Sequence, residues 1–196
     1  MYRFIWDIYY DKDFEYAIPK LLSRFVSEVV GAVLKSDSFD LKDFKITIDG
    51  YEYFVCVDST KDFKDIIDDF NMDRLLDLAS EIFGPFGIGY EYGLIDYRYY
   101  ETDEDEEIPT SMDARYNLNM KCLKTHKMLS KLISDFIISA YNIFLCEESW
   151  EFKDLRITVD FHESLLSLES KCDFHKFISR FNNNGFPCEY TCNIGE

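Results

Sequence analysis

Carboxylates are the residue type whose number and spacing in this sequence most strongly suggest a chemical role. The chain of 196 residues has 38 acidic and 21 basic residues, so its formal net charge at pH 7 is −17. Five acids recur at a spacing of four residues, from Asp65 to Glu81, and residues 101–107 (ETDEDEE) contain six acids. Such an excess of negative charge repels phosphate backbones and favours encounter with a basic protein.

Each acidic group also has a purely structural interpretation. Like charges spaced four apart cost about 0.2–0.5 kcal/mol per pair in a continuous helix, which would point to a function. The apolar stripe of this stretch changes direction near Asn71, however, and predicts two helices of about 61–70 and 72–83. We therefore favour a solvated polar face for the spaced acids, whereas the run 101–107, next to Pro109, is typical of a linker. The residues predicted to bind a partner are Asp73, Asp77, Glu81, Glu101, Asp103, Glu104, Asp105, Glu106 and Glu107.

Six cysteines and three histidines are the other residues with chemical potential. Cys172, His175, Cys188 and Cys192 have the composition of a zinc site. Cys188 and Cys192 lie four apart on an expected strand, which separates their Cα atoms by about 13 Å, too far for one tetrahedral ion. No histidine has a neighbouring Ser or Cys in a nucleophile-like motif. The sequence thus predicts free thiols, no metal, no cofactor and no catalytic residues.

The elements that must position these residues follow from an internal repeat. Residues 39–50 (FDLKDFKITIDG) and 150–161 (WEFKDLRITVDF) align at a constant offset of 111. The identical positions are Lys42/Lys153, Asp43/Asp154, Ile46/Ile157, Thr47/Thr158 and Asp49/Asp160. The same offset continues downstream through Ser59/Ser170 and Phe63/Phe174. A repeat on this scale indicates a duplicated structural unit.

Hydrophobic periodicity predicts the same order of elements, β-α-β-β-α-β, in both halves. In the first half we expect strands at 2–10, 44–48, 51–57 and 89–99 and helices at 17–35, 61–70 and 72–83. In the second half we expect strands at 114–120, 155–159, 162–168 and 187–193 and helices after Thr125 and Ser170. Asp49-Gly50 predicts a two-residue hairpin loop that opposes Ile48 to Tyr51. Phe161 replaces Gly50 in the second copy, so we expect that turn to be strained or differently shaped.

This order is the ferredoxin-like arrangement, so the predicted fold is α+β with tandem duplicated ferredoxin-like units and antiparallel four-stranded sheets. The predicted domains are 1–100 with an extra helix at about 72–83, an acidic linker at 101–113, and 114–196. RNA-recognition domains share the order but carry a glycine and a basic residue on the third strand, which 51–57 and 162–168 lack. The glycine-rich stretch 84–93 precedes a strand instead of opening a helix, as a phosphate-binding loop would. We interpret its glycines as turn residues.

No apolar run reaches the roughly 18 residues that a membrane span needs, and no signal peptide is evident, so the sequence predicts a cytoplasmic protein. The first functional hypothesis is a non-enzymatic acidic inhibitor that occludes a basic nuclease or nucleic-acid-binding protein, by analogy with anti-defence and toxin-immunity proteins. Under this hypothesis, the protein does not itself bind nucleic acid or membranes. The alternative is a regulatory module that binds a small molecule between the units or at a dimer interface. An enzyme is the third hypothesis, and it has the least support.

Overall fold

The computed structural model describes residues 1–7, 18–69, 97–101, 112–118, 126–146, 150–170, 174–183 and 190–193. The strands are β1 (Tyr2–Asp7), β2 (Phe44–Asp49), β3 (Phe54–Ser59), β4 (Tyr97–Glu101), β5 (Met112–Asn117), β6 (Leu155–Asp160), β7 (Leu165–Ser170) and β8 (Tyr190–Asn193). The helices are α1 (Ile18–Lys35), α2 (Lys64–Asp69), α4 (His126–Phe144) and α5 (Phe174–Asn183), and short 3₁₀ turns η2 (Leu41–Asp43) and η6 (Phe152–Asp154) precede β2 and β6. The α+β class is confirmed.

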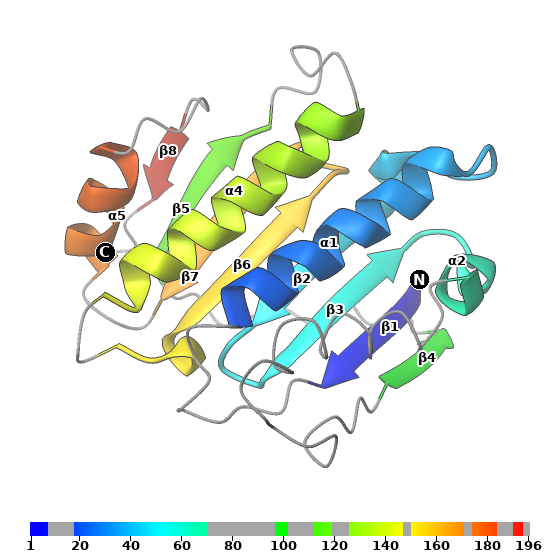
Figure 1. Cartoon of the computed structure of the whole chain (residues 1–196), viewed down its shortest axis with the longest axis horizontal. Helices are drawn as coiled ribbons and strands as arrows, with labels where there is room; N and C mark the ends of the chain where they lie inside the picture. Colours follow the sequence, from blue (N-terminus) through cyan, green and yellow to red (C-terminus); the bar gives the residue numbers. More distant parts are fainter. Residues whose placement is uncertain are drawn as a thin grey trace.

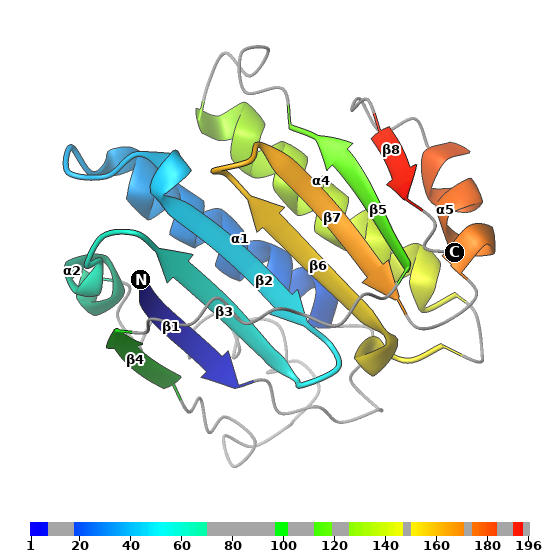
Figure 2. The ribbon, with the colours of Figure 1, turned by 180° about the vertical axis from the view of Figure 1, so that it is seen from behind.

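All eight described strands belong to one antiparallel sheet with the order β4-β1-β3-β2-β6-β7-β5-β8. The prediction of two separate four-stranded sheets is therefore wrong, because β2 and β6, the inner edges of the two halves, pair with each other. Helices α1 and α4 lie side by side on one face of this sheet, and α2 and α5 lie towards its two ends (Figure 1). None of the described helices covers the opposite face, which is seen in Figure 2.

The first strand and helix form as the sequence predicts. Helix α1 spans 18–35, and Pro19 occupies its first turn, where the missing N–H has no partner to lose. Its buried residues recur at three- and four-residue spacing, and Phe25 packs against Phe4 and Trp6 of β1 at ring-centroid distances of 6.3 and 5.0 Å. Since side chains alternate along a strand, Arg3, which directly precedes Phe4, projects to the helix-free face.

The hairpin between β2 and β3 has a longer loop than predicted. Asp49 lies opposite Phe54 and Ile48 opposite Val55, so four residues, 50–53, form the loop instead of two. The Asp49 carboxylate explains the difference, because it accepts hydrogen bonds from the backbone N–H groups of Tyr51 (2.9 Å) and Glu52 (3.2 Å) and organises a wider turn. The shift is an even number of residues, so Ile48 and Val55 still share the buried face.

The second hairpin repeats this turn and is not differently shaped. Its loop also has four residues, 161–164, and Asp160 accepts a hydrogen bond from the N–H of Glu163 at 2.9 Å. Both loops end in a residue of positive φ, Tyr53 at 56° and Ser164 at 55°, and these residues are 111 apart. The left-handed conformation thus falls at the fourth loop position in each copy, so Phe161 does not have to adopt it.

Several predicted boundaries need correction. Glu101 is the last residue of β4, and β5 begins at Met112, so the ends of the predicted linker 101–113 and the start of the second unit at 114 belong to strands. Helix α2 begins at Lys64 instead of 61. The predicted helix 72–83 and the glycine-rich stretch 84–93 lie outside the described residues.

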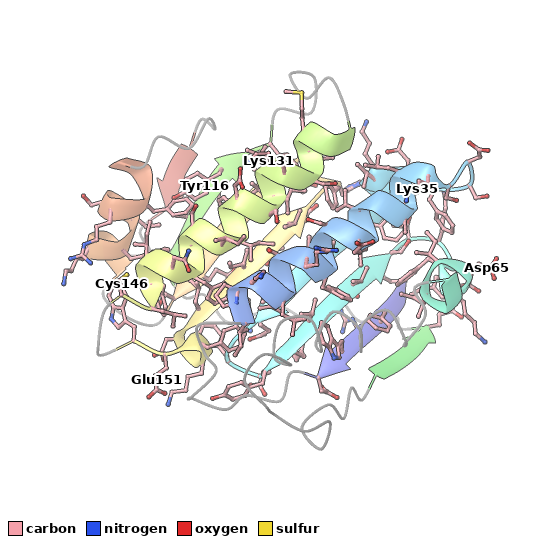
Figure 3. The ribbon with its side chains drawn as sticks, viewed as in Figure 1. Lys35, Asp65, Tyr116, Lys131, Cys146 and Glu151 are labelled. Atoms are coloured by element: carbon pink, nitrogen blue, oxygen red, sulfur yellow. The ribbon has the colours of Figure 1, made fainter. Side chains whose placement is uncertain are left out.

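Helices α1 and α4 bury one continuous hydrophobic core against the sheet. Tyr116 of β5 and Phe136 of α4 meet edge to face at 5.4 Å, and Phe181 of α5 packs against both rings. Tyr116 is buried, whereas Lys131 of α4 and Lys35 of α1 are exposed; all three are labelled in Figure 3. Burial of such aromatic groups supplies the main driving force for packing α4 and α5 against the sheet.

Candidate functional site

Most of the acidic residues predicted to bind a partner lie outside the described residues. These are Asp73, Asp77, Glu81, Asp103, Glu104, Asp105, Glu106 and Glu107. Glu101 is the exception: it is exposed at the end of β4, an edge strand of the sheet, opposite Tyr2 of β1. The structure therefore places the start of the acidic run at one edge of the sheet.

The charges of the described part are close to balance. It contains 16 of the 21 basic residues but only 20 of the 38 acidic residues, so it carries −4 of the net −17. The remaining 18 acids are accompanied by only five bases, outside the described residues. The negative charge of this chain is therefore concentrated in segments other than the described strands and helices.

At least six basic residues of the described part have acidic partners, four of them on the surface and two buried. On the surface, Lys61 pairs with Asp43 and Lys153 with Glu151, each at 2.7 Å. Further surface pairs within single helices are Lys131–Asp135 and Arg24–Glu28. Exposed pairs of this kind contribute little to stability, typically below about 1 kcal/mol. They do, however, occupy bases that would otherwise neutralise the surplus of carboxylates.

The strongest polar cluster surrounds Asp49 at the junction of β2 and β6. Arg156 donates to the Asp49 carboxylate through Nε at 2.8 Å and Nη2 at 2.6 Å, and both side chains are over 90% buried. The same guanidinium reaches Glu169 through Nη1 at 3.5 Å and lies over the ring of Tyr51, with Cζ 4.9 Å from its centroid. Buried charge of this kind requires a partner, so the cluster fixes how the two halves meet.

A second buried pair lies on the same helix-free face. Arg3 of β1 donates to Asp58 of β3 through Nε at 2.7 Å and Nη2 at 3.4 Å. The strand register places Asp58 opposite Lys45, and Lys45 opposite Asp160. Positive and negative side chains therefore alternate across four neighbouring strands, and opposite charges facing each other across strands stabilise a sheet. This row has a structural explanation and does not require a ligand.

Tyr141 of α4 carries a buried hydroxyl near the Asp49 carboxylate. Its side chain is fully buried and stacks on Phe152 at 5.1 Å, and its hydroxyl has no hydrogen-bond partner among the described residues. Burial, with smaller contributions from the nearby Asp49 carboxylate and Tyr51, raises the pKa of Tyr141 well above its usual value. The phenol therefore stays protonated near neutral pH and cannot act there as a general base.

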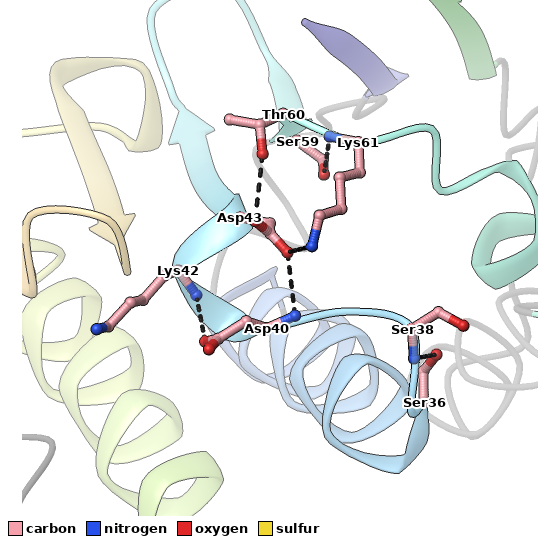
Figure 4. A network of polar contacts seen from close by, with 8 residues as sticks. All are labelled: Ser36, Ser38, Asp40, Lys42, Asp43, Ser59, Thr60 and Lys61. Carbon is pink, nitrogen blue, oxygen red and sulfur yellow. Dashed lines mark hydrogen bonds and ion pairs between the residues drawn. The ribbon is translucent and has the colours of Figure 1, made fainter.

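The repeated Lys-Asp motif positions the 3₁₀ turn before each junction strand. Asp43 accepts a hydrogen bond from the N–H of Asp40 and pairs with Lys61 (Figure 4), and Asp154 accepts one from the N–H of Glu151, each at 3.0 Å. Partial burial acts to raise the pKa of Asp43, but the bonds from Lys61, Asp40 and Thr60 outweigh it and hold that pKa below its usual value. The identical residues of the repeat are thus explained by local structure.

No metal-binding constellation occurs within the described ranges. No group of three His, Cys, Asp or Glu residues there is arranged to hold a metal ion. His162 is exposed beside Glu163 at 3.8 Å, Cys56 is buried and Cys146 is exposed. Of the residues with zinc-like composition, Cys192 lies in β8 and His175 in α5, whereas Cys172 and Cys188 lie outside the described residues.

The chain matches no protein-family model, no curated protein and no solved structure. Its function must therefore be argued from its own residues. Within the described ranges, no helix combines the length and the hydrophobicity needed to cross a bilayer.

Sequence reasoning missed the buried ion pairs. Arg156 and Asp49 were recognised only as repeat positions and turn residues, and Arg3 and Asp58 were not singled out. The repeat contained a usable signal: a base at 45 and 156 and an acid at 49 and 160 become opposite neighbours once the two copies of the strand pair in antiparallel orientation. These opposite neighbours could be recognised only with the pairing of β2 with β6 in hand, and the hydrophobic pattern of one strand does not predict which strand it pairs with.

Proposed function

We propose that this chain is a non-enzymatic acidic binding protein that occludes a basic partner, such as a nuclease or another nucleic-acid-binding protein. The observation that carries the proposal is the separation of charge: the described residues carry only −4 of the net −17. At least six of the 16 described bases pair with acids of the same described part, among them Arg3 with Asp58 and Arg156 with Asp49. These pairs leave fewer internal cations to neutralise the surplus carboxylates.

The carboxylates of the run that starts at Glu101 would then pair with the basic side chains of the partner, in the place that nucleic-acid phosphates normally occupy. A basic site that normally binds a nucleic acid presents Lys and Arg side chains, and carboxylates can pair with these groups. Binding replaces the mobile counterions around both surfaces, so the association is steered by charge and weakens as salt increases. The inhibitor blocks the site by occupying it, and no chemical step is needed.

We further propose that the scaffold is a duplicated ferredoxin-like unit. Each half has the element order β-α-β-β-α-β, with strand orders β4-β1-β3-β2 and β8-β5-β7-β6. Counted from the first strand of each half, both orders are 4-1-3-2. The matched loop residues of positive φ, Tyr53 and Ser164, support the same interpretation.

The small-molecule alternative gains no support from the junction between the halves. In the described part, β2 pairs directly with β6, and α1 contacts α4 above that pair. The residues along this seam, among them Ile46, Ile48 and Ile157, are buried by protein. The described junction therefore offers a ligand no obvious place, and we retain the inhibitor as the proposed function.

The direct test is inhibition of a panel of purified basic nucleases, each assayed on its nucleic-acid substrate with increasing amounts of this protein. We expect inhibition of at least one nuclease at stoichiometric concentrations, competitive with substrate and weakened when NaCl is raised from 50 to about 300 mM. An absence of inhibition across the panel, or inhibition that does not respond to salt, would contradict the proposal.

Two matched variants locate the surface responsible. In one, Asp103, Glu104, Asp105 and Glu106 become Asn or Gln, and in the other, the exposed acids Asp37, Glu52, Asp65 and Glu163 are changed in the same way. Both lose four negative charges, so an effect of net charge alone would be equal in the two. We expect the first variant to lose inhibition at least tenfold more strongly than the second.

A further inference from the structure

The junction between the halves is built from one duplicated strand paired with its own copy. Thr47 lies opposite Thr158, its counterpart at the offset of 111, and Ile46 and Ile48 lie opposite Val159 and Ile157. A local two-fold relation therefore passes between Thr47 and Thr158. Without this pairing, β2 and β6 would each be an exposed edge strand with an apolar face, which is a template for association.

Contacts beyond the ladder repeat the same two-fold relation. Gly50 donates its N–H to the carbonyl of Leu155 at 3.1 Å, and Phe161 donates its N–H to the carbonyl of Phe44 at 3.2 Å. Under the offset of 111, Gly50 corresponds to Phe161 and Leu155 corresponds to Phe44, so these two hydrogen bonds are equivalent. Helices α1 and α4 also contact each other along the junction (Figure 1). The surface has the geometry of an isologous dimer interface within one chain.

Gly50 and Phe161 break this symmetry. A Cβ atom at position 50 would lie 2.1 Å from the carbonyl oxygen of Phe152 and 2.4 Å from that of Leu155, so only glycine fits there. At the equivalent position of the other copy, the whole side chain of Phe161 is accommodated and is 1% exposed. The two ends of the junction are therefore not interchangeable.

We propose that this junction is a heterospecific docking surface, in which the first half of the chain recognises the second half and neither half recognises itself. If two second halves paired in this geometry, Phe161 would take the place of Gly50 and clash with the carbonyls of Phe152 and Leu155 in its neighbour. If two first halves paired, the volume filled by Phe161 would be empty, and a cavity of that size is destabilising. The fitting partner of each half is the other half, with Gly50 and Phe161 as the residues that set the specificity.

The test starts from the intact, folded chain. A site-specific protease sequence is inserted after Ile108, the folded protein is cleaved, and the product is examined by size-exclusion chromatography and native mass spectrometry. We expect the cleaved protein to elute with the intact one and to give only a complex of one first half with one second half. Separation of the halves on dilution to about 1 µM, or complexes of two second halves, would overturn the proposal.

A glycine pair provides the matched variant and control. Gly50→Ala introduces a Cβ that meets backbone atoms, whereas Gly31→Ala in α1 introduces one with no atom within 4 Å. After cleavage, we expect the Gly50→Ala halves to bind each other at least tenfold more weakly and the Gly31→Ala halves to bind as in the unmodified protein. Equal affinities in the two variants would contradict the role of Gly50. If the Gly50→Ala chain does not fold, native mass spectrometry of the cleaved unmodified protein still decides the proposal.

Discussion

The two halves share a backbone frame but use different side chains at equivalent places. Both have a four-residue hairpin loop closed by a residue near φ 55°, although one begins with Gly50 and the other with Phe161. Arg3 pairs with Asp58 in the first half, whereas the strand register places Asp113 opposite Glu169 in the second. Turn geometry and strand register are therefore the same in both copies, whereas side-chain packing and charge differ between them.

The largest effect should come from the position where packing diverged most. Phe161→Ala removes a fully buried ring next to the junction, and we expect a loss of about 3–5 kcal/mol in the free energy of unfolding. Urea denaturation measures it, with Met128→Ala, at a side chain 47% exposed, as the control that stays within about 0.5 kcal/mol. A loss below about 1 kcal/mol for Phe161→Ala would show that its volume is not needed.

The second-largest effect should be a difference in stability loss between substitutions of the two repeated aspartates, Asp49 and Asp160. Asp49→Asn removes the carboxylate charge closest to the buried Arg156 and leaves Glu169, at 3.5 Å, as its remaining carboxylate partner, so we expect a loss of about 2–3 kcal/mol. Asp160→Asn at the equivalent position, which is only half-buried, should cost below about 1 kcal/mol. Denaturation of both variants at one pH gives the comparison, and equal losses would mean that the buried pair does not distinguish the halves.

A smaller effect concerns Asp43 and the dependence of stability on pH. Because the pKa of Asp43 is lowered in the folded protein, the unfolded chain binds more protons around its usual value of 3.8. The stability that this carboxylate adds is therefore present above pH 3.8 and is lost as pH falls through the lowered pKa. The partner Lys61 is 52% exposed, so the contribution stays below about 1 kcal/mol.

Urea denaturation at pH 7 and pH 3 tests this contribution. Asp43→Asn should lower stability at pH 7 and leave it nearly unchanged at pH 3, which reduces the difference between the two conditions. Asp37→Asn, at an exposed acid a few residues away, serves as the control. An equal loss at both pH values for Asp43→Asn would show that its role is independent of its charge.

The smallest effect is expected at Tyr141. Tyr141→Phe removes a buried hydroxyl without a hydrogen-bond partner among the described residues, so stability at pH 7 should be unchanged or up to about 1 kcal/mol higher. Because the pKa of Tyr141 is raised, the unmodified protein should lose stability relative to the variant as pH rises above 10.0. A loss above about 1 kcal/mol at pH 7 would reveal a partner for this hydroxyl.

Much of the fold could be predicted from the sequence because it depends on local periodicity. Helix α1 was placed within one residue, and the faces of β2 and β3 were correct, since apolar residues repeat with the period of each element. The loop of the first hairpin was missed because the Asp49 carboxylate, and not the glycine that follows it, determines the turn. The single sheet and the Arg156–Asp49 pair depend on contacts between residues at least 107 apart in the sequence, which no local pattern reveals.

The candidate site, too, could be predicted from the sequence only in part. Composition and the run 101–107 predicted an acidic partner-binding surface, and this remains a prediction because eight of its nine named residues lie outside the described part. The structure adds the charge balance of the remaining chain, which shows that the described strands and helices do not account for the acidic surplus. That contrast between a nearly balanced scaffold and acidic segments is the basis of the proposed function.

The most direct test of this account is the salt dependence of binding to an inhibited basic nuclease, measured by calorimetric titration for three proteins. These are the unmodified chain, the variant neutralised at residues 103–106, and the variant neutralised at Asp37, Glu52, Asp65 and Glu163. The account predicts that affinity falls steeply with salt for the first and third proteins and is weak and nearly independent of salt for the second. Equal affinity and equal salt dependence in all three would contradict it.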